Sequence, residues 1–304
     1  MSGWTSAEKQ LITAATALAP SVHNTRPWVL EFHDEHISLY ERLDRALPHH
    51  DPVGRDRLIS CGAALEHVLL AARFLGRVVD IDPRHDRAHP DEVVRVTATG
   101  RAEPSDGDRR RYRAISARRS HRGEFAARPV ERDLRRELLG GHDVDGVGLR
   151  PVTEPGEVAV LARLLNHSAL VLRADRAYQR ELAAWTAPVR DPSPGAGVSS
   201  ATRRVATLPW AGLVRPTTAI PDVGFLADRL SRELLLLVQT PDDGRYDHVR
   251  AGMAAERTWL TATDAGLVGS VLTQPCQLHE VRAGLVESLS LAGFPQLLLR
   301  LGHP

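Results

Sequence analysis

Lysine is almost absent from this sequence, which has one lysine, Lys9, among its 39 basic residues. Schiff-base catalysis would have to use that residue, and its place in the first predicted helix argues against such chemistry. Cysteine is also scarce. Cys61 and Cys276 lie far apart and form no Cys-x-x-Cys pair, which argues against a disulfide framework or a zinc site and predicts two buried thiols.

Long hydrophobic runs are missing, since stretches such as Leu234–Val238 are far too short to span a bilayer. The segment Met1–Thr5 lacks the basic and apolar blocks of a secretory signal, so we expect a cytoplasmic protein without a membrane partner. Charge is nearly balanced at +1, which gives no indication of a nucleic-acid partner. With 304 residues and 42% hydrophobic composition, the chain can bury one large core or two moderate ones.

The common signatures of other enzyme classes are absent. The sequence contains no G-x-G-x-x-G, G-x-x-x-x-G-K-[ST], H-E-x-x-H or G-x-S-x-G motif, which argues against dinucleotide-fold, phosphoryl-transfer, zinc-protease and α/β-hydrolase functions. His33 with His36, or His49 and His50 with Asp51, are conceivable metal ligands. We expect these loop histidines to be solvated and predict no metal site.

Hydrophobic spacing predicts a mixture of helices and strands on either side of a joint at Gly100–Gly107. Two predicted helices, one on each side, are rich in Gly and Ala and therefore thin, which suggests an internal duplication with halves at 1–107 and 108–304. The long segment 188–221, rich in Pro and Gly, is interpreted as a lid. The predicted helices cover 5–18, 55–76, a stretch ending at Arg119, 131–139, 157–172, 175–185 and 246–265, and the strands 28–32, 36–40, 92–99, 147–152, 233–240 and 296–301.

The most informative segment is Pro20–Trp28, which reads Pro-Ser-Val-His-Asn-Thr-Arg-Pro-Trp and follows the first predicted helix. Because it is short, polar and punctuated by proline, its backbone groups are free to bond the heteroatoms of a flat ring. Trp28 opens a strand and is predicted to pack in the core. His23 is interpreted as a solvated loop histidine, with a substrate contact as the alternative.

A second informative segment is Arg118–Arg122, which reads Arg-Arg-Ser-His-Arg and is expected near the end of a helix. Guanidinium groups beside a hydroxyl suit a phosphate. The alternative is a solvated helix face, which is an equally good interpretation for the neighbouring Arg109–Arg113.

Together the two segments resemble the FMN-dependent nitroreductase superfamily, in the branch whose single chain contains two halves. Members carry Pro-Ser-x-x-Asn-x-Gln-Pro-Trp and Arg-x-Ser-x-Arg segments, and Arg26 departs from this pattern by standing where the family has glutamine. A third segment, Gly266–Pro275, follows a thin helix as the family's Gly-Leu cofactor loop does, and the ending Pro295–Gly302 is also similar. Taken alone, the third segment equally fits a helix-terminating glycine followed by a strand.

The resemblance implies an α+β fold with a central, mainly antiparallel sheet flanked by helices, in which two intertwined halves stand in for the family's homodimer. It implies bound FMN, with flavin N5 rather than a side chain performing the chemistry, and a redox-tuning role for Arg122 near N1. The cofactor-binding residues implied are Pro20, Ser21, Val22 and Asn24 from the first segment, Arg118, Arg119, Ser120 and Arg122 from the second, and Ser270, Val271, Leu272 and Thr273 from the third.

The function implied is an oxidoreductase that passes hydride from NAD(P)H through FMN to a small aromatic acceptor, either a nitro compound or a quinone. One alternative is a protein that sequesters FMN beneath the 188–221 segment with little turnover. A second is a flavin-free scaffold. Both a monomer and a homodimer are compatible with the sequence.

Overall fold

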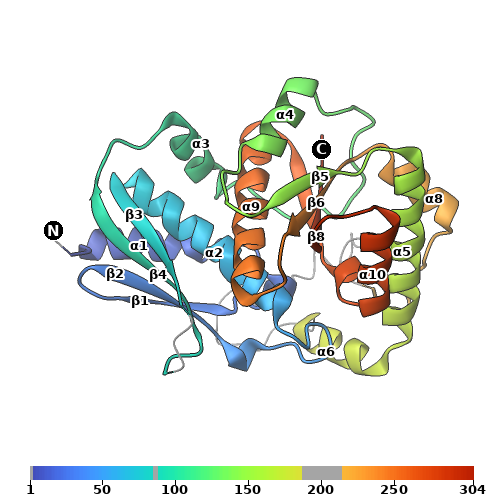
Figure 1. Ribbon diagram of the computed structural model, residues 1–304, viewed down its shortest axis with the longest axis horizontal. Helices are drawn as coiled ribbons and strands as arrows, with labels where there is room; N and C mark the ends of the chain where they lie inside the picture. Colours follow the sequence, from blue (N-terminus) through green and yellow to red (C-terminus); the bar gives the residue numbers. More distant parts are fainter. Residues whose placement is uncertain (1–2, 85–87, 187–213) are drawn as a thin grey trace.

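The computed structural model describes residues 3–84, 88–186 and 214–304 (Figure 1). Its strands form two four-stranded sheets in which each neighbouring pair is antiparallel, in the orders β1-β2-β4-β3 and β5-β6-β8-β7. The expected α+β class with antiparallel strands is confirmed, and the strands are divided between two sheets. Their bounds are β1 (Trp28–Phe32), β2 (His36–Glu41), β3 (Arg77–Pro83), β4 (Glu92–Arg101), β5 (Gly148–Pro151), β6 (Leu234–Thr240), β7 (Val268–Leu272) and β8 (Phe294–Gly302).

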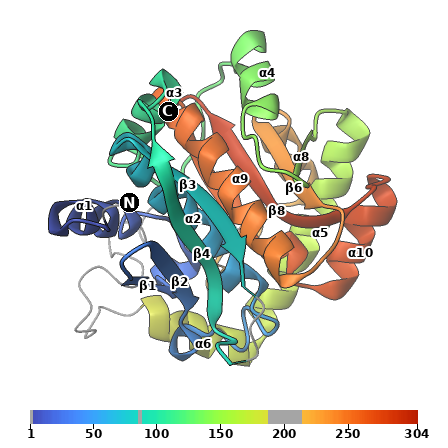
Figure 2. The ribbon, with the colours of Figure 1, turned by 60° about the vertical axis from the view of Figure 1, so that its left-hand side comes forward.

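Helices cover the sheets and separate them, with α2 and α9 side by side between the two sheets (Figures 1 and 2). None of the described helices is both long enough and apolar enough to cross a membrane. The helix bounds are α1 (Ser6–Thr16), α2 (Arg55–Phe74), α3 (Asp106–Ala114), α4 (Arg132–Gly140), α5 (Pro155–Ala174), α6 (Arg176–Thr186), α8 (Val223–Leu230), α9 (Arg245–Asp264) and α10 (His279–Ser288).

Helices α2 and α9 cross with their backbones in close contact, and glycines in the sequence make this possible. Both helices have 20 residues and both follow a glycine N-cap. A Cβ on Gly62 would lie 2.0 Å from the Val249 carbonyl oxygen, and a Cβ on Gly252 would lie 2.0 Å from the Ile59 carbonyl oxygen. The two glycines therefore occupy reciprocal positions that allow the two backbones to touch.

The hydrophobic core beneath the first sheet is built from segments that lie far apart in the sequence. Val94 of β4 and Val68 of α2 belong to the same buried cluster as Val249 and Met253 of α9. Trp28 also lies in this cluster, with 9% of its surface exposed, which confirms the prediction that it packs in the core. Helix α9, which follows β6 of the second sheet, thus completes the core beneath the first sheet.

Three predictions about local structure need correction or qualification. The helix expected to reach Arg119 ends at Ala114, because the backbone of Ser120 instead forms a parallel bridge with Gly269 and the His121 N–H donates to the Gly269 carbonyl at 2.7 Å. Strand β3 and helices α8 and α10 were not predicted. Of the predicted lid, 188–213 lie outside the described residues, while the Val214 carbonyl accepts a hydrogen bond from Gln179 at 2.9 Å.

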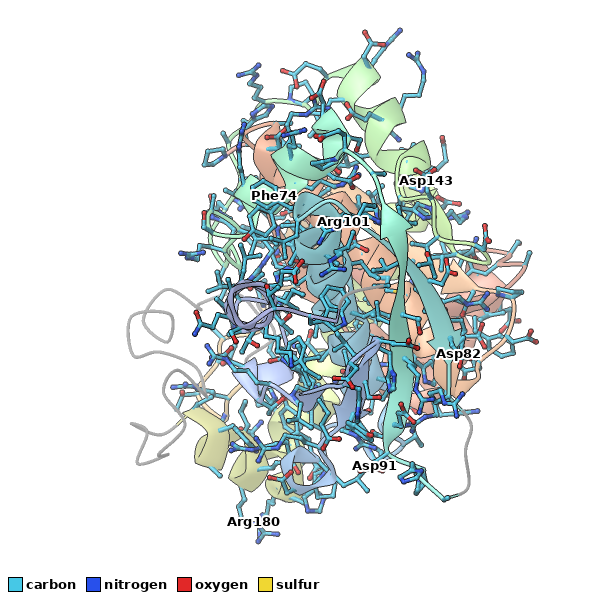
Figure 3. All side chains as sticks on the ribbon, turned by 90° about the vertical axis from the view of Figure 1, so that its left-hand side faces the viewer. Phe74, Asp82, Asp91, Arg101, Asp143 and Arg180 are labelled. Atoms are coloured by element: carbon cyan, nitrogen blue, oxygen red, sulfur yellow. The ribbon has the colours of Figure 1, made fainter. Side chains whose placement is uncertain are left out.

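Helix α3 packs against both α2 and α9. Phe74 at the end of α2 stacks on Tyr112 of α3, with 4.1 Å between ring centroids. Figure 3 labels Phe74, the last residue of α2, and Arg101, the last residue of β4. The aromatic contact anchors the segment that carries the chain from the first sheet towards the second.

An ion pair fixes α1 to the edge of the first sheet. Glu8 accepts the Thr5 N–H at 2.8 Å in a capping box and also binds Arg77 of β3 through Nε at 2.8 Å and Nη2 at 2.9 Å. The hydrogen bonds from Arg77 lower the pKa of Glu8 to about 2. Since the folded state depresses this pKa, the stabilisation is present above the unfolded pKa and is lost as the pH falls towards 2.

We therefore expect Glu8→Gln to lower the free energy of unfolding by about 2–3 kcal/mol at pH 7. At pH 2 to 3 the difference from the unmodified chain should shrink, because protonation has already weakened the pair in the unmodified protein. Urea unfolding at the two pH values measures this. The control Glu103→Gln removes a carboxylate that is 94% exposed, so we expect no more than about 0.5 kcal/mol at either pH. A Glu8→Gln effect independent of pH would contradict the assignment.

Candidate functional site

A cleft opens where the loop after α1, the helices α2 and α9, and strand β7 meet. Including its open mouth, it contains about 880 Å³ of empty space, which is the scale of a small-molecule site. Its walls come from segments that are far apart in the sequence. The lining residues are Pro20, Ser21, Val22, His23, His50, Asp56, Ile59, Ser60, Ala63, Ser120, Arg122, Gly252, Ala255, Glu256, Trp259, Ser270, Val271, Thr273, Gln274 and Leu297.

The cleft brings together residues from all three segments singled out in the sequence. Eight of the twelve candidate residues line it, namely Pro20, Ser21, Val22, Ser120, Arg122, Ser270, Val271 and Thr273. The other four, Asn24, Arg118, Arg119 and Leu272, do not line the cleft.

The loop between α1 and β1 is held in an unusual backbone conformation. His23, Asn24 and Arg26 have φ values of 47°, 56° and 50°, in the left-handed region that residues other than glycine rarely adopt. Two serines hold it there, since Ser60 Oγ accepts the Val22 N–H at 3.2 Å and Ser21 Oγ accepts the Arg26 N–H at 3.0 Å. Backbone conformations that are strained and held in place by hydrogen bonds are typical of binding sites.

Arg26 points away from the cleft. Its side chain lines a different hollow with Thr13, Thr16, Arg42 and Arg45. The position at which this chain departs from the family's glutamine is therefore not part of the cleft wall.

The arginines of the second segment occupy two different places. Arg122 lines the cleft, and burial lowers its pKa to about 10, so it remains a cation at neutral pH. Arg118 is instead buried beneath the wall, with Nε 3.3 Å from Glu256 and its guanidinium 4.6 Å from the Trp259 ring centroid. Arg119 is exposed, and its Nη1 donates to the Arg118 carbonyl at 2.7 Å.

Strand β7 explains which residues of the third segment face the cleft. Val271 and Thr273 line it, whereas Leu272 between them is fully buried in a hydrophobic cluster. Val271 and Leu272 therefore point to opposite faces, as successive side chains of a strand do, while Ser270 also contributes to the lining. The Oγ of Ser270, at the same wall, accepts a hydrogen bond from Arg300 at 3.3 Å.

Two histidines that the sequence analysis expected to be solvated are buried in the cleft wall. His23 is 7% exposed and His50 is 4% exposed, and their rings meet at 3.2 Å between Nε2 and Nδ1. His50 is held by α6, because its N–H donates to Glu181 at 2.7 Å and its ring stacks on Tyr178. These contacts with α6 join residues more than 120 positions apart, and nothing in the local sequence pattern indicated them.

Several buried polar atoms of the wall have no partner among the described residues. Both side-chain amide atoms of Gln274 and the Oε2 of Glu256 make no hydrogen bond with any described residue. Gln274 is only 3% exposed. Buried polar groups normally find partners, so this wall is suited to a ligand that offers both donors and acceptors.

Comparisons with known proteins identify relatives in Mycobacterium tuberculosis. No family model matches the chain. A protein of strain CDC 1551 / Oshkosh named "Putative NAD(P)H nitroreductase" is 30% identical over 299 residues, covering 93% of this chain and 81% of its own. The protein named "Putative NAD(P)H nitroreductase acg", of strain ATCC 25618 / H37Rv, is 29% identical over 295 residues, covering 93% and 85%.

Among solved structures, the FMN-dependent nitroreductase NfnB from Mycobacterium smegmatis, in complex with NADPH, aligns with a TM-score of 0.41 and 16% identity, covering 65% of this chain and 89% of its own. The nitroreductase with bound FMN from Bacteroides fragilis NCTC 9343 aligns with a TM-score of 0.39 and 15% identity, covering 64% and 87%. The mycobacterial sequence relatives extend over nearly the whole chain and decide its classification. This chain belongs to the NAD(P)H nitroreductase family.

Proposed function

We propose that this protein is an FMN-binding oxidoreductase of the nitroreductase type, which passes hydride from NAD(P)H through the flavin to a small aromatic acceptor, a nitro compound or a quinone. The observation that carries the proposal is the cleft, whose wall combines the loop at Ser21 and Val22, the cation Arg122 and the strand residues Val271 and Thr273. These are the segments through which the sequence resembles flavin-binding relatives.

The residues of the cleft fit FMN chemically. Arg122 and the Ser120 hydroxyl are suited to the ribityl phosphate or to negative charge on the ring. Ile59, Ala63 and Leu297 provide apolar surface for the flat tricycle, and the unpartnered amide of Gln274 offers a donor and an acceptor to its polar edge. When bound, FMN supplies reversible two-electron chemistry at N5.

The protein's own contribution is to bind, orient and exclude water. Arg122 places a positive charge in a partly buried wall, where it offsets negative charge more strongly than it would in water. Arg118 acts indirectly, because its contacts with Glu256 and Trp259 hold these two side chains of the wall in place. Asn24 and Arg119 are proposed to support the loops that carry Val22 and Ser120.

We also propose that the chain consists of two nitroreductase-like halves, 1–107 and 108–304, that replace the two subunits of a homodimer. The same strand order in the two sheets supports this, as do the equal lengths of α2 and α9 and the reciprocal contacts of Gly62 and Gly252. The cleft takes residues from both halves, so neither half would form it alone.

The purified protein is expected to be yellow, and Arg122→Ala should purify largely colourless, with FMN affinity lowered at least tenfold, because the partly buried cation is lost. Absorbance near 450 nm and titration of the apoprotein with FMN measure this. Arg136→Ala, which removes an arginine whose side chain is 79% exposed on α4, is the matched control and should retain its colour. Full retention of FMN by Arg122→Ala would refute the role assigned to this residue.

Turnover is tested separately, by following NADPH and NADH oxidation in the presence of menadione or a nitroaromatic compound. The proposal predicts steady-state oxidation by the yellow protein. A bound flavin that dithionite reduces but pyridine nucleotides do not would instead support sequestration of FMN.

A further inference from the structure

A chain of polar side chains runs from the cleft into the protein. His23, in the cleft wall, meets His50 at 3.2 Å, and the other ring nitrogen of His50 lies 2.6 Å from Nε2 of Gln277. Gln277 Nε2 in turn donates to Asp56 Oδ2 at 3.1 Å. His23, His50 and Asp56 are all buried, so the direction of each hydrogen bond follows from which of their atoms carry protons.

The buried carboxylate sets that direction. Burial disfavours the charged form of Asp56, but the adjacent Arg55, at 2.9 Å, outweighs it and lowers the pKa of Asp56 well below its usual range. Asp56 is therefore ionised and only accepts hydrogen bonds. An amide oxygen facing it would be repelled, so Gln277 must present its nitrogen, as it does.

The same amide nitrogen fixes the proton on His50. Nε2 of His50 lies 2.6 Å from the Gln277 amide nitrogen and 3.4 Å from Asp56 Oδ2. Because the contact with Gln277 is the shorter one, we assign Nε2 as the acceptor of a Gln277 N–H and place the proton of a singly protonated His50 ring on Nδ1. His50 Nδ1 then donates to Nε2 of His23. By elimination, neutral His23 carries its own proton on Nδ1.

The surroundings of His23 keep it neutral. Burial lowers its pKa well below the usual value, and the nearby His50 and Arg122 lower it further, while Asp56 acts in the opposite direction. These are the titratable and charged groups that face the ring, from the loop before α2, from the segment after α3 and from α2 itself. At neutral pH His23 is therefore a hydrogen-bond donor without a charge.

We propose that His23 is the residue that hydrogen-bonds the oxygen of the electron acceptor, a quinone carbonyl or a nitro group, as a neutral N–H donor from the cleft wall. His50 and Gln277 are positioning residues that hold the ring in the donating tautomer. Negative charge grows on that oxygen when the acceptor takes up hydride, and a fixed donor in a partly buried site stabilises it. This proposal rests on the proposed function and specifies the acceptor contact.

The first test is acceptor binding without turnover. Menadione is titrated into the oxidised FMN-loaded protein in the absence of a reductant, and the perturbation of the flavin spectrum gives the dissociation constant. His23→Gly removes the donor and accepts a φ of 47° without strain, so we expect about tenfold weaker menadione binding with unchanged FMN affinity. His23→Asn also tolerates this backbone conformation and retains an N–H donor, so it should recover part of the affinity.

The control is His33→Asn, which changes an exposed histidine of the β1-β2 turn and should leave menadione binding unchanged. Equal menadione affinity in His23→Gly and the unmodified protein, with FMN bound to both, would overturn the proposal and leave the proposed function standing. Loss of FMN affinity in His23→Gly without a change in menadione affinity would also overturn it, because His23 would then contact the cofactor. A chain that binds no FMN would refute the proposed function itself.

A second test reads the tautomer directly. In protein labelled with ¹⁵N-histidine, long-range ¹H–¹⁵N spectra should show neutral His23 protonated at Nδ1 at pH 7. His50→Leu removes the donor to Nε2 and should shift His23 towards the Nε2-protonated form, an effect that a purely structural role for His50 would not produce. Nε2 protonation of His23 in the unmodified protein would overturn the assignment.

Discussion

Gly252→Ala is expected to lower the free energy of unfolding by about 3 kcal/mol or more, and to abolish retention of FMN. The added methyl group would lie 2.0 Å from the Ile59 carbonyl oxygen, a backbone atom that cannot rotate away. Overpacking of this kind forces whole elements apart. Here the elements are α2 and α9, which carry much of the cleft wall, so the stability and the site should fail together.

The matched control is Gly156→Ala, a helix substitution with no atom within 4 Å of the new methyl group. It should be neutral or stabilising by up to about 1 kcal/mol, because alanine favours the helix more than glycine does. Urea unfolding and absorbance near 450 nm measure both variants. A Gly252→Ala protein as stable as the Gly156→Ala protein would show that the two helices do not cross at this distance.

The same glycines illustrate how much of the fold the sequence can predict. Small residues at helical spacing are sufficient to predict both long helices, because a helix that packs closely on another must be thin along one face. The hairpin of β1 and β2 is predicted equally well from its alternation. These features depend on neighbouring residues, so a local pattern is sufficient to reveal them.

The features that escaped prediction depend on distant partners. His50 is buried because Glu181 and Tyr178 of α6 hold it, and Arg118 turns beneath the cleft because Glu256 of α9 attracts it. Leu272 belongs to a segment that borders the cleft, but the pairing of β7 with β8 is needed to show that its side chain faces the core. The sequence motifs indicate which segments meet at the cleft. Which of their side chains face it can be seen only once the fold is known.

A second large effect is expected at the same helix crossing, from Arg257→Met. Arg257 binds Glu66 through Nε and Nη2, both at 2.8 Å, and donates Nη1 to the His142 carbonyl at 2.7 Å. The Glu66 side chain is fully buried, so the substitution would leave a carboxylate without its counter-charge in the interior. We expect the free energy of unfolding to fall by about 3–5 kcal/mol.

The double variant Glu66→Leu/Arg257→Met separates the cost of an unpaired charge from the loss of packing. Replacing both partners with apolar side chains removes the buried charge, so most of the lost stability should return, as measured by urea unfolding. Arg136→Met, which breaks a pair with Asp133 that is almost fully exposed, should change stability by less than about 1 kcal/mol. If the double variant were as unstable as Arg257→Met alone, the shape of the arginine rather than its charge would hold α2 and α9 together. The hydrogen bond between His67 and Glu256, at 2.8 Å, joins the same two helices and is unchanged in both variants.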